Sequence, residues 1–64
     1  MMERNIIKLE KEIRVKMMNI RSGNLLPKDS GIGKLINLMK SFDEVLYDEI
    51  MKEYKDLLIK IKTQ

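Results

Sequence analysis

The apolar residues of this chain recur every three or four positions over two long stretches, with one break between them. That spacing keeps side chains on one face of an α-helix, so each stretch is predicted to form an amphipathic helix. The first helix, over about residues 3–21, is expected to end before Gly23, because glycine suits a left-handed cap. Its predicted apolar stripe consists of Met2, Ile6, Leu9, Ile13, Met17 and Ile20.

A linker is predicted over residues 22–31. Pro27 disfavours helix at the residue before it, and Asp29, Ser30 and Gly31 are typical of a turn. Either Asp29 or Ser30 is a suitable cap for the helix that follows.

The second stretch has two interpretations. Residues 34–62 contain no proline or glycine, which favours one continuous helix over about residues 31–62. The competing signal is the capping box S-x-x-E at Ser41 and Glu44, where a new helix would begin. The predicted fold is therefore all-α: one small domain, residues 1–64, forming an antiparallel helical hairpin, or three helices if the chain breaks near Ser41. The stripe of this stretch is Ile32, Leu35, Met39, Phe42, Leu46, Ile50, Tyr54, Leu57 and Ile61.

A continuous second helix would be longer than the first, at about 45 Å against about 28 Å, and its last turns would lack cover. An exposed apolar surface of that kind is typical of an interface. We therefore expect a second chain to cover this surface, either in a homodimer that forms a four-helix bundle or by docking on a larger protein. If the helix instead breaks near Ser41, its C-terminal part is expected to fold back and cover the surface itself. The candidate interaction residues are Ile50, Met51, Tyr54, Leu57, Leu58 and Ile61.

Two further features of the sequence bear on partners. Ile7, Val15 and Met18 lie roughly opposite the stripe of the first helix, either as ordinary surface residues or as a second contact surface. Glu53 falls near the centre of the second stripe. It marks either a drift of the stripe or a charge that faces a basic partner.

Composition narrows the chemistry. The 64 residues include no cysteine or histidine, which excludes disulfides, zinc ribbons and Cys–His or Ser–His catalysis. A chain this short that has neither disulfides nor a structural metal usually self-associates or binds a partner. The clustered carboxylates of Asp43, Glu44, Asp48 and Glu49 lie on a face predicted to be wet, whereas a catalytic general acid needs burial. We expect a non-enzymatic regulatory protein with no cofactor, metal or small-molecule substrate.

The charge pattern leaves an alternative open. Lysine and arginine number 13 against 10 acidic residues, a net charge of +3. Arg4, Lys8, Lys11 and Arg14 form a basic face that could bind nucleic acid. This is the less favoured function, because Glu12 lies nearby and no aromatic residues alternate with the cations.

The expected location is cytoplasmic, since no apolar run is long enough to span a membrane and charges interrupt any signal-peptide pattern. The alanine-free composition, rich in lysine and isoleucine, is typical of an AT-rich genome, such as that of a phage.

Two short motifs resemble known families. The pattern D-x-G-x-G at residues 29–33 resembles a box of the histidine-kinase ATPase family, whose α/β sandwich is several times larger, so the two glycines are interpreted as a helix-entry turn. The plan of short helix, loop and longer helix is similar to small sporulation-control phosphatases, which act on an aspartyl phosphate of a response regulator. Of their S-Q-E-L-D marker, residues 39–43 keep the final acid, Asp43, and an apolar residue before it. The resemblance implies docking on a response regulator, a second alternative function, and no activity is carried over.

Overall fold

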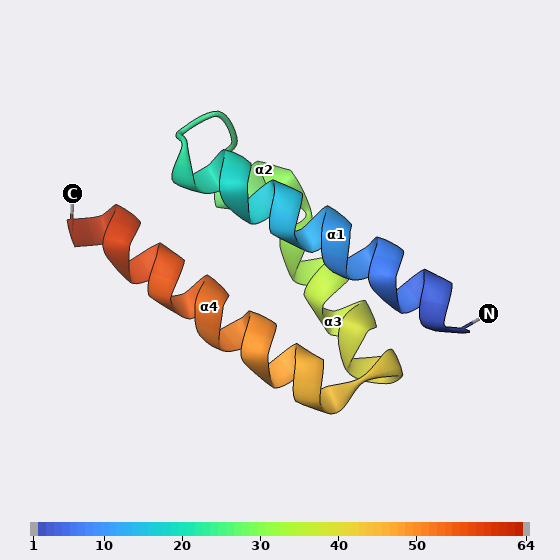
Figure 1. Cartoon of the computed structure of the whole chain (residues 1–64). Helices are drawn as coiled ribbons and strands as arrows, with labels where there is room; N and C mark the ends of the chain where they lie inside the picture. The colour runs from blue at the N-terminus through green and yellow to red at the C-terminus, as the bar shows by residue number, and fades with distance from the viewer. Residues whose placement is uncertain (1, 64) are drawn as a thin grey trace.

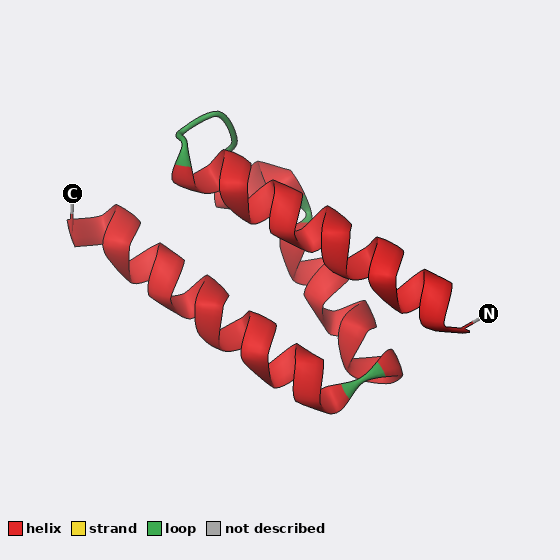
Figure 2. Cartoon of the chain, in the orientation of Figure 1, coloured by secondary structure: helices red, strands yellow, loops and turns green. Residues whose placement is uncertain are grey.

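The computed structural model describes the backbone of residues 2–63 and the side chains of residues 5–62. Within this part the chain forms four helices and no strand: α1 (Met2–Arg21), α2 (Pro27–Ser30), α3 (Ile32–Phe42) and α4 (Glu44–Thr63). Only short loops separate the helices (Figure 2). The all-α prediction is confirmed.

The three longer helices form an up-down-up bundle (Figure 1). α3 runs antiparallel to both α1 and α4, so α1 and α4 point in the same direction. Each of the three contacts the other two. The bundle is elongated, with extents of 40 × 19 × 14 Å, and α2 is a single turn in the connection between α1 and α3.

The core lies where the apolar stripes of the three helices meet. The stripe of α1 is buried as predicted, apart from Ile6, which is half-buried, and Met2, whose side chain lies outside the described residues. In α3, Ile32 and Met39 of the predicted stripe are fully buried. Ile36, which the predicted stripe omitted, is fully buried as well, while its neighbour Leu35 is half-buried. The buried apolar residues are Leu9, Ile13, Met17, Ile20, Ile32, Ile36, Met39, Ile50 and Leu57.

α1 ends where the sequence indicates. Gly23 has a φ of +81°, in the left-handed region that favours glycine. Its N–H donates to the carbonyl of Ile20 at 3.1 Å, and the N–H of Asn24 donates to the carbonyl of Asn19 at 2.9 Å. This pair of hydrogen bonds is the Schellman motif, which satisfies carbonyls that the last helical turn leaves without partners.

The continuous second helix is wrong, because the chain is extended at Asp43, with φ −159° and ψ 102°. The Asp43 carboxylate accepts a hydrogen bond from the N–H of Leu46 at 3.1 Å, and the Asp43 N–H donates to the carbonyl of Met39 at 2.9 Å. Ser41, the predicted cap, instead donates its hydroxyl to the carbonyl of Leu38 at 2.8 Å. The three-helix alternative is therefore right, with the cap two residues later than predicted.

Replacing Asp43 by alanine should lower the free energy of unfolding by about 1 kcal/mol, because the first turn of α4 loses its capping oxygen. Asp43→Asn is the matched control, since the amide oxygen keeps the acceptor and should restore most of the loss. Chemical denaturation followed by circular dichroism measures both variants. Equal losses for alanine and asparagine would show that the cap contributes nothing to this corner.

The predicted linker contains one helical turn, α2, that the sequence did not indicate. The hydroxyl of Ser30 donates to the carbonyl of Pro27 at 2.7 Å and accepts from the N–H of Ile32 at 3.1 Å. Ser30 thus joins the end of α2 to the start of α3, one of the two capping roles expected for this turn. Gly31 lies between the two helices with a φ of +69°.

The two glycines of this turn should respond to alanine in opposite directions. Gly31→Ala is expected to cost about 1–2 kcal/mol of unfolding free energy, because a Cβ is strained at its positive φ. Gly33→Ala should add up to about 1 kcal/mol, because Gly33 is helical and no atom lies within 4 Å of the added Cβ. Thermal melts of both variants test this, and a loss at both positions would contradict the helix-entry interpretation.

Candidate interaction surface

The C-terminal candidates face mainly inward. Ile50 and Leu57 are buried in the core, and Met51 and Tyr54 are half-buried against it. Leu58 is half-buried and Ile61 is 38% exposed. Because the corner at Asp43 folds α4 back onto α1 and α3, most of this surface is covered by the chain itself.

The basic candidates divide into two groups. Lys8, Lys11 and Arg14 are all exposed on α1, whereas the side chain of Arg4 lies outside the described residues. Within the described part of the chain, Lys8 and Lys11 have no ion-pair partner. Arg14 is held by two carboxylates.

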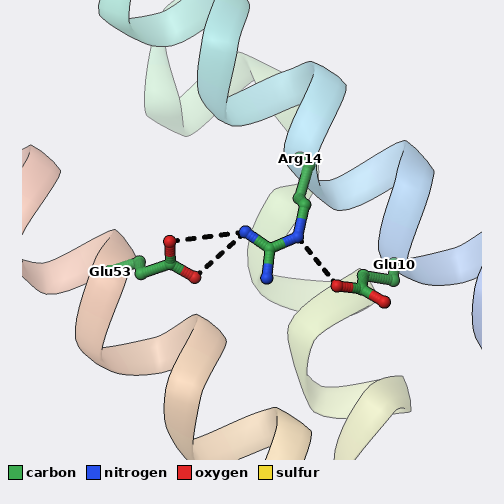
Figure 3. Close-up of polar contacts among 3 residues, drawn as sticks. All are labelled: Glu10, Arg14 and Glu53. Carbon is green, nitrogen blue, oxygen red and sulfur yellow. Dashed lines mark hydrogen bonds and ion pairs between the residues drawn. The ribbon is translucent and has the colours of Figure 1, made fainter.

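Arg14 bridges two helices (Figure 3). Its Nε donates to Glu10 Oε2 at 2.8 Å on α1, and its Nη1 donates to Glu53 Oε2 and Oε1 on α4, at 3.1 and 3.3 Å. The hydrogen bond to Glu10 is the main cause that raises the pKa of Arg14, and the charge of Glu53 adds to it. Such an exposed pair contributes at most about 1 kcal/mol to stability. The basic residue that Glu53 faces therefore belongs to its own chain.

Three apolar residues and two lysines are exposed on the side of α1 that points away from the bundle. We call this side the outward face of α1 and define it by Ile7, Lys8, Lys11, Val15 and Met18. At about 100° per residue, all five lie roughly 120–160° around the helix from the buried Ile13. Ile7 is 65% exposed, Val15 47% and Met18 66%.

The surroundings of Val15 are slightly concave. Lys8, Lys11, Glu12 and Val15 line a shallow open hollow on this face. A second open hollow follows the seam between α1 and α3, where it is lined by Asn5, Lys8, Leu9, Glu12, Leu38 and Phe42. Lys8 and Glu12 border both hollows, so the outward face continues into the seam.

The other exposed apolar residues of the described part of the chain are spread over several elements, and Ile61 at the end of α4 is one of them. Val45 and Ile59 lie on the outside of α4, about 21 Å apart along the helix axis. Leu38 on α3 and Leu26 before α2 are on separate elements. The outward face of α1 is thus where three exposed apolar side chains share one helix face with two cations.

The acidic candidates of the sequence lie around the start of α4. The acid carried by the phosphatase resemblance, Asp43, caps α4, and its neighbours Glu44, Asp48 and Glu49 are exposed. In the described part of the chain, no three acidic side chains cluster closely enough to hold a metal ion. Among the described residues, no helix is both long and apolar enough to cross a membrane.

Comparison with protein-family models, with curated proteins and with solved structures finds no match for this chain. The candidate surface therefore rests on its geometry.

Proposed function

We propose that this chain is a small non-enzymatic regulatory protein that docks on a larger protein through the outward face of α1. The observation that carries the proposal is the exposure of Ile7, Val15 and Met18 on one face of α1. The opposite face of the helix is the one buried in the core. Apolar patches bordered by polar groups mark interaction sites on soluble proteins. Methionine at such a site suits a surface that adapts to its partner.

The total surface supports the same proposal. The chain exposes 5147 Å², whereas a compact globule of 7.6 kDa exposes about 4,300 Å². An elongated bundle of three helices leaves more surface in water than a compact chain of the same mass does. Contact with a partner would remove part of that surface from water.

The homodimer predicted from the sequence stays a prediction. Its original basis was an uncovered end of a long second helix, and Ile50 and Leu57 of that end lie in the core of the single chain. A dimer would therefore need another surface. The cytoplasmic location stays part of the proposal.

Nucleic-acid binding has less support. Arg14 is engaged by Glu10 and Glu53, which leaves Lys8 and Lys11 as the free cations of the described basic set. Three exposed apolar side chains beside them would gain nothing from phosphate contacts.

Site-specific photocrosslinking tests the docking surface. A photoreactive residue at position 7, on the outward face of α1, is compared with one at position 45, which is 72% exposed on α4. In cells that produce the protein naturally, position 7 should give a discrete adduct heavier than two copies of the chain. Equal labelling from positions 7 and 45, or an adduct from position 45 alone, would overturn the proposal.

A further inference from the structure

We infer that the partner of the outward face of α1 is an acidic protein surface: an amphipathic helix whose carboxylates flank its apolar side chains. This inference rests on the proposed function and adds the chemistry of the partner. Three observations support it: the charge of the face, the length of the face, and the repulsion between lysines that would arise if two copies of the chain paired through it.

The charge of the face is unbalanced. Lys8 and Lys11 lie among the exposed apolar residues and have no ion-pair partner in the described part of the chain. On α1, Glu10 is bound by Arg14 and Glu12 lies at the border of the face. Covering Ile7, Val15 and Met18 also takes water from the two lysines, which is costly unless the partner supplies opposite charge. The contact therefore requires carboxylates beside apolar groups.

The length of the face suits a helix. Ile7 and Met18 are 11 residues apart, which is about 16 Å along the helix axis. Three turns of a facing helix span the same distance, and their apolar positions recur at the same spacing. Lys8 lies at one edge of the face and Lys11 within it, and both side chains are long enough to reach carboxylates beside that apolar stripe.

A second copy of the chain lacks this chemistry at the required place. Pairing two outward faces of α1 sets Lys8 and Lys11 of each copy against those of the other, which is repulsive. Acidic residues of the chain do occur at the start of α4, where Glu44, Asp48 and Glu49 are exposed. However, the outer sides of α1 and α4 are different surfaces of the bundle, so that pairing is head-to-tail and does not form a symmetric dimer.

Other polyanions fit less well. A phosphate backbone meets the lysines but leaves Ile7 and Met18 in water. A bilayer would bury the apolar residues, but Lys11 lies in the middle of them and the face has no aromatic residue.

Two synthetic helical peptides serve as probes. Both carry leucine at positions i, i+4, i+7 and i+11, with glutamate at the flanking positions of one and lysine at those of the other. Fluorescence anisotropy with the full chain should show the acidic peptide binding at least about 10-fold more tightly than the basic one at low salt. Lys8→Glu with Lys11→Glu should reverse that order. Lys52→Glu with Lys55→Glu is the matched control, since it makes the same charge change on exposed positions of α4.

Several outcomes would overturn the inference. These are equal binding of the two peptides, equal effects of the two double reversals, or tighter binding of a DNA duplex or of phosphatidylglycerol vesicles than of the acidic peptide. Self-association in sedimentation equilibrium that Ile7→Ser with Met18→Ser abolishes would also overturn it.

The same titrations separate this inference from the proposed function. If Ile7→Ser with Met18→Ser removes peptide binding while both charge reversals leave it unchanged, the docking face stands and the acidic partner is wrong. If none of the three double variants changes binding, both the face and its partner are wrong.

Discussion

Replacing Ile50 by alanine is expected to lower the free energy of unfolding by about 2–5 kcal/mol. Ile50 has no exposed surface and lies in the core beneath α1 and α3. Deleting its side chain leaves a cavity that three helices would have to collapse to fill. A 64-residue domain has a total stability of only about 3–10 kcal/mol, so this variant should lose much of its helical signal under mild conditions.

Ile59→Ala is the matched control for Ile50→Ala. It makes the same change on the same helix at a residue that is 60% exposed, and should cost about 0.5 kcal/mol or less. Chemical denaturation followed by circular dichroism gives both values. Equal costs would mean that α4 does not pack on the bundle. If the loss of unfolding free energy caused by Ile50→Ala depended on protein concentration, Ile50 would instead lie in a dimer interface.

Replacing both Ile7 and Met18 by serine is expected to weaken docking by about 100-fold. Each side chain lost from the centre of an interface costs about 1–2 kcal/mol, and about 1.4 kcal/mol corresponds to a tenfold change in affinity. The unfolding free energy should change by less than about 1 kcal/mol, because both residues are exposed in the free chain. Titration with the acidic peptide, or with the crosslinked partner, measures the loss.

The control for this pair is Val45→Ser with Ile59→Ser, which removes two equally exposed apolar side chains from α4. Affinity should stay within about twofold of the parent chain, as for most residues outside an interface. If the α4 pair weakened docking as much as the α1 pair, the binding surface would not be the outward face of α1.

Local signals in the sequence account for much of the fold. The spacing of Leu9, Ile13 and Met17 predicted the buried face of α1, and Gly23 marked its end, because both depend on residues close in sequence. The corner at Asp43 was harder to place. A stripe that continues in phase fits a straight helix and also two helices that turn the same side inward, so periodicity did not distinguish the two. The capping-box pattern indicated Ser41 as the cap, whereas the structure uses the aspartate two residues later.

The candidate surface depended on that corner. Ile50 and Leu57 were assigned to an interface because a straight helix would have exposed them, and the turn at Asp43 places them in the core instead. The pairing of Arg14 with Glu53 joins residues 39 apart in sequence, so only the assembled bundle reveals it. Met18, by contrast, lies opposite the core stripe by helical geometry alone, which is why the sequence already indicated it.

The measurement that tests the docking surface most directly is the reactivity of single cysteines, which the cysteine-free sequence makes specific. Met18→Cys and Ile59→Cys should react rapidly and at similar rates with a maleimide in the purified protein, because the two positions are 66% and 60% exposed. In cells that make the protein at its natural level, Met18→Cys should react at least about tenfold more slowly than in the purified protein, while Ile59→Cys keeps its rate. Equal reactivity of the two cysteines in cells, or protection of Ile59→Cys alone, would contradict docking through the outward face of α1.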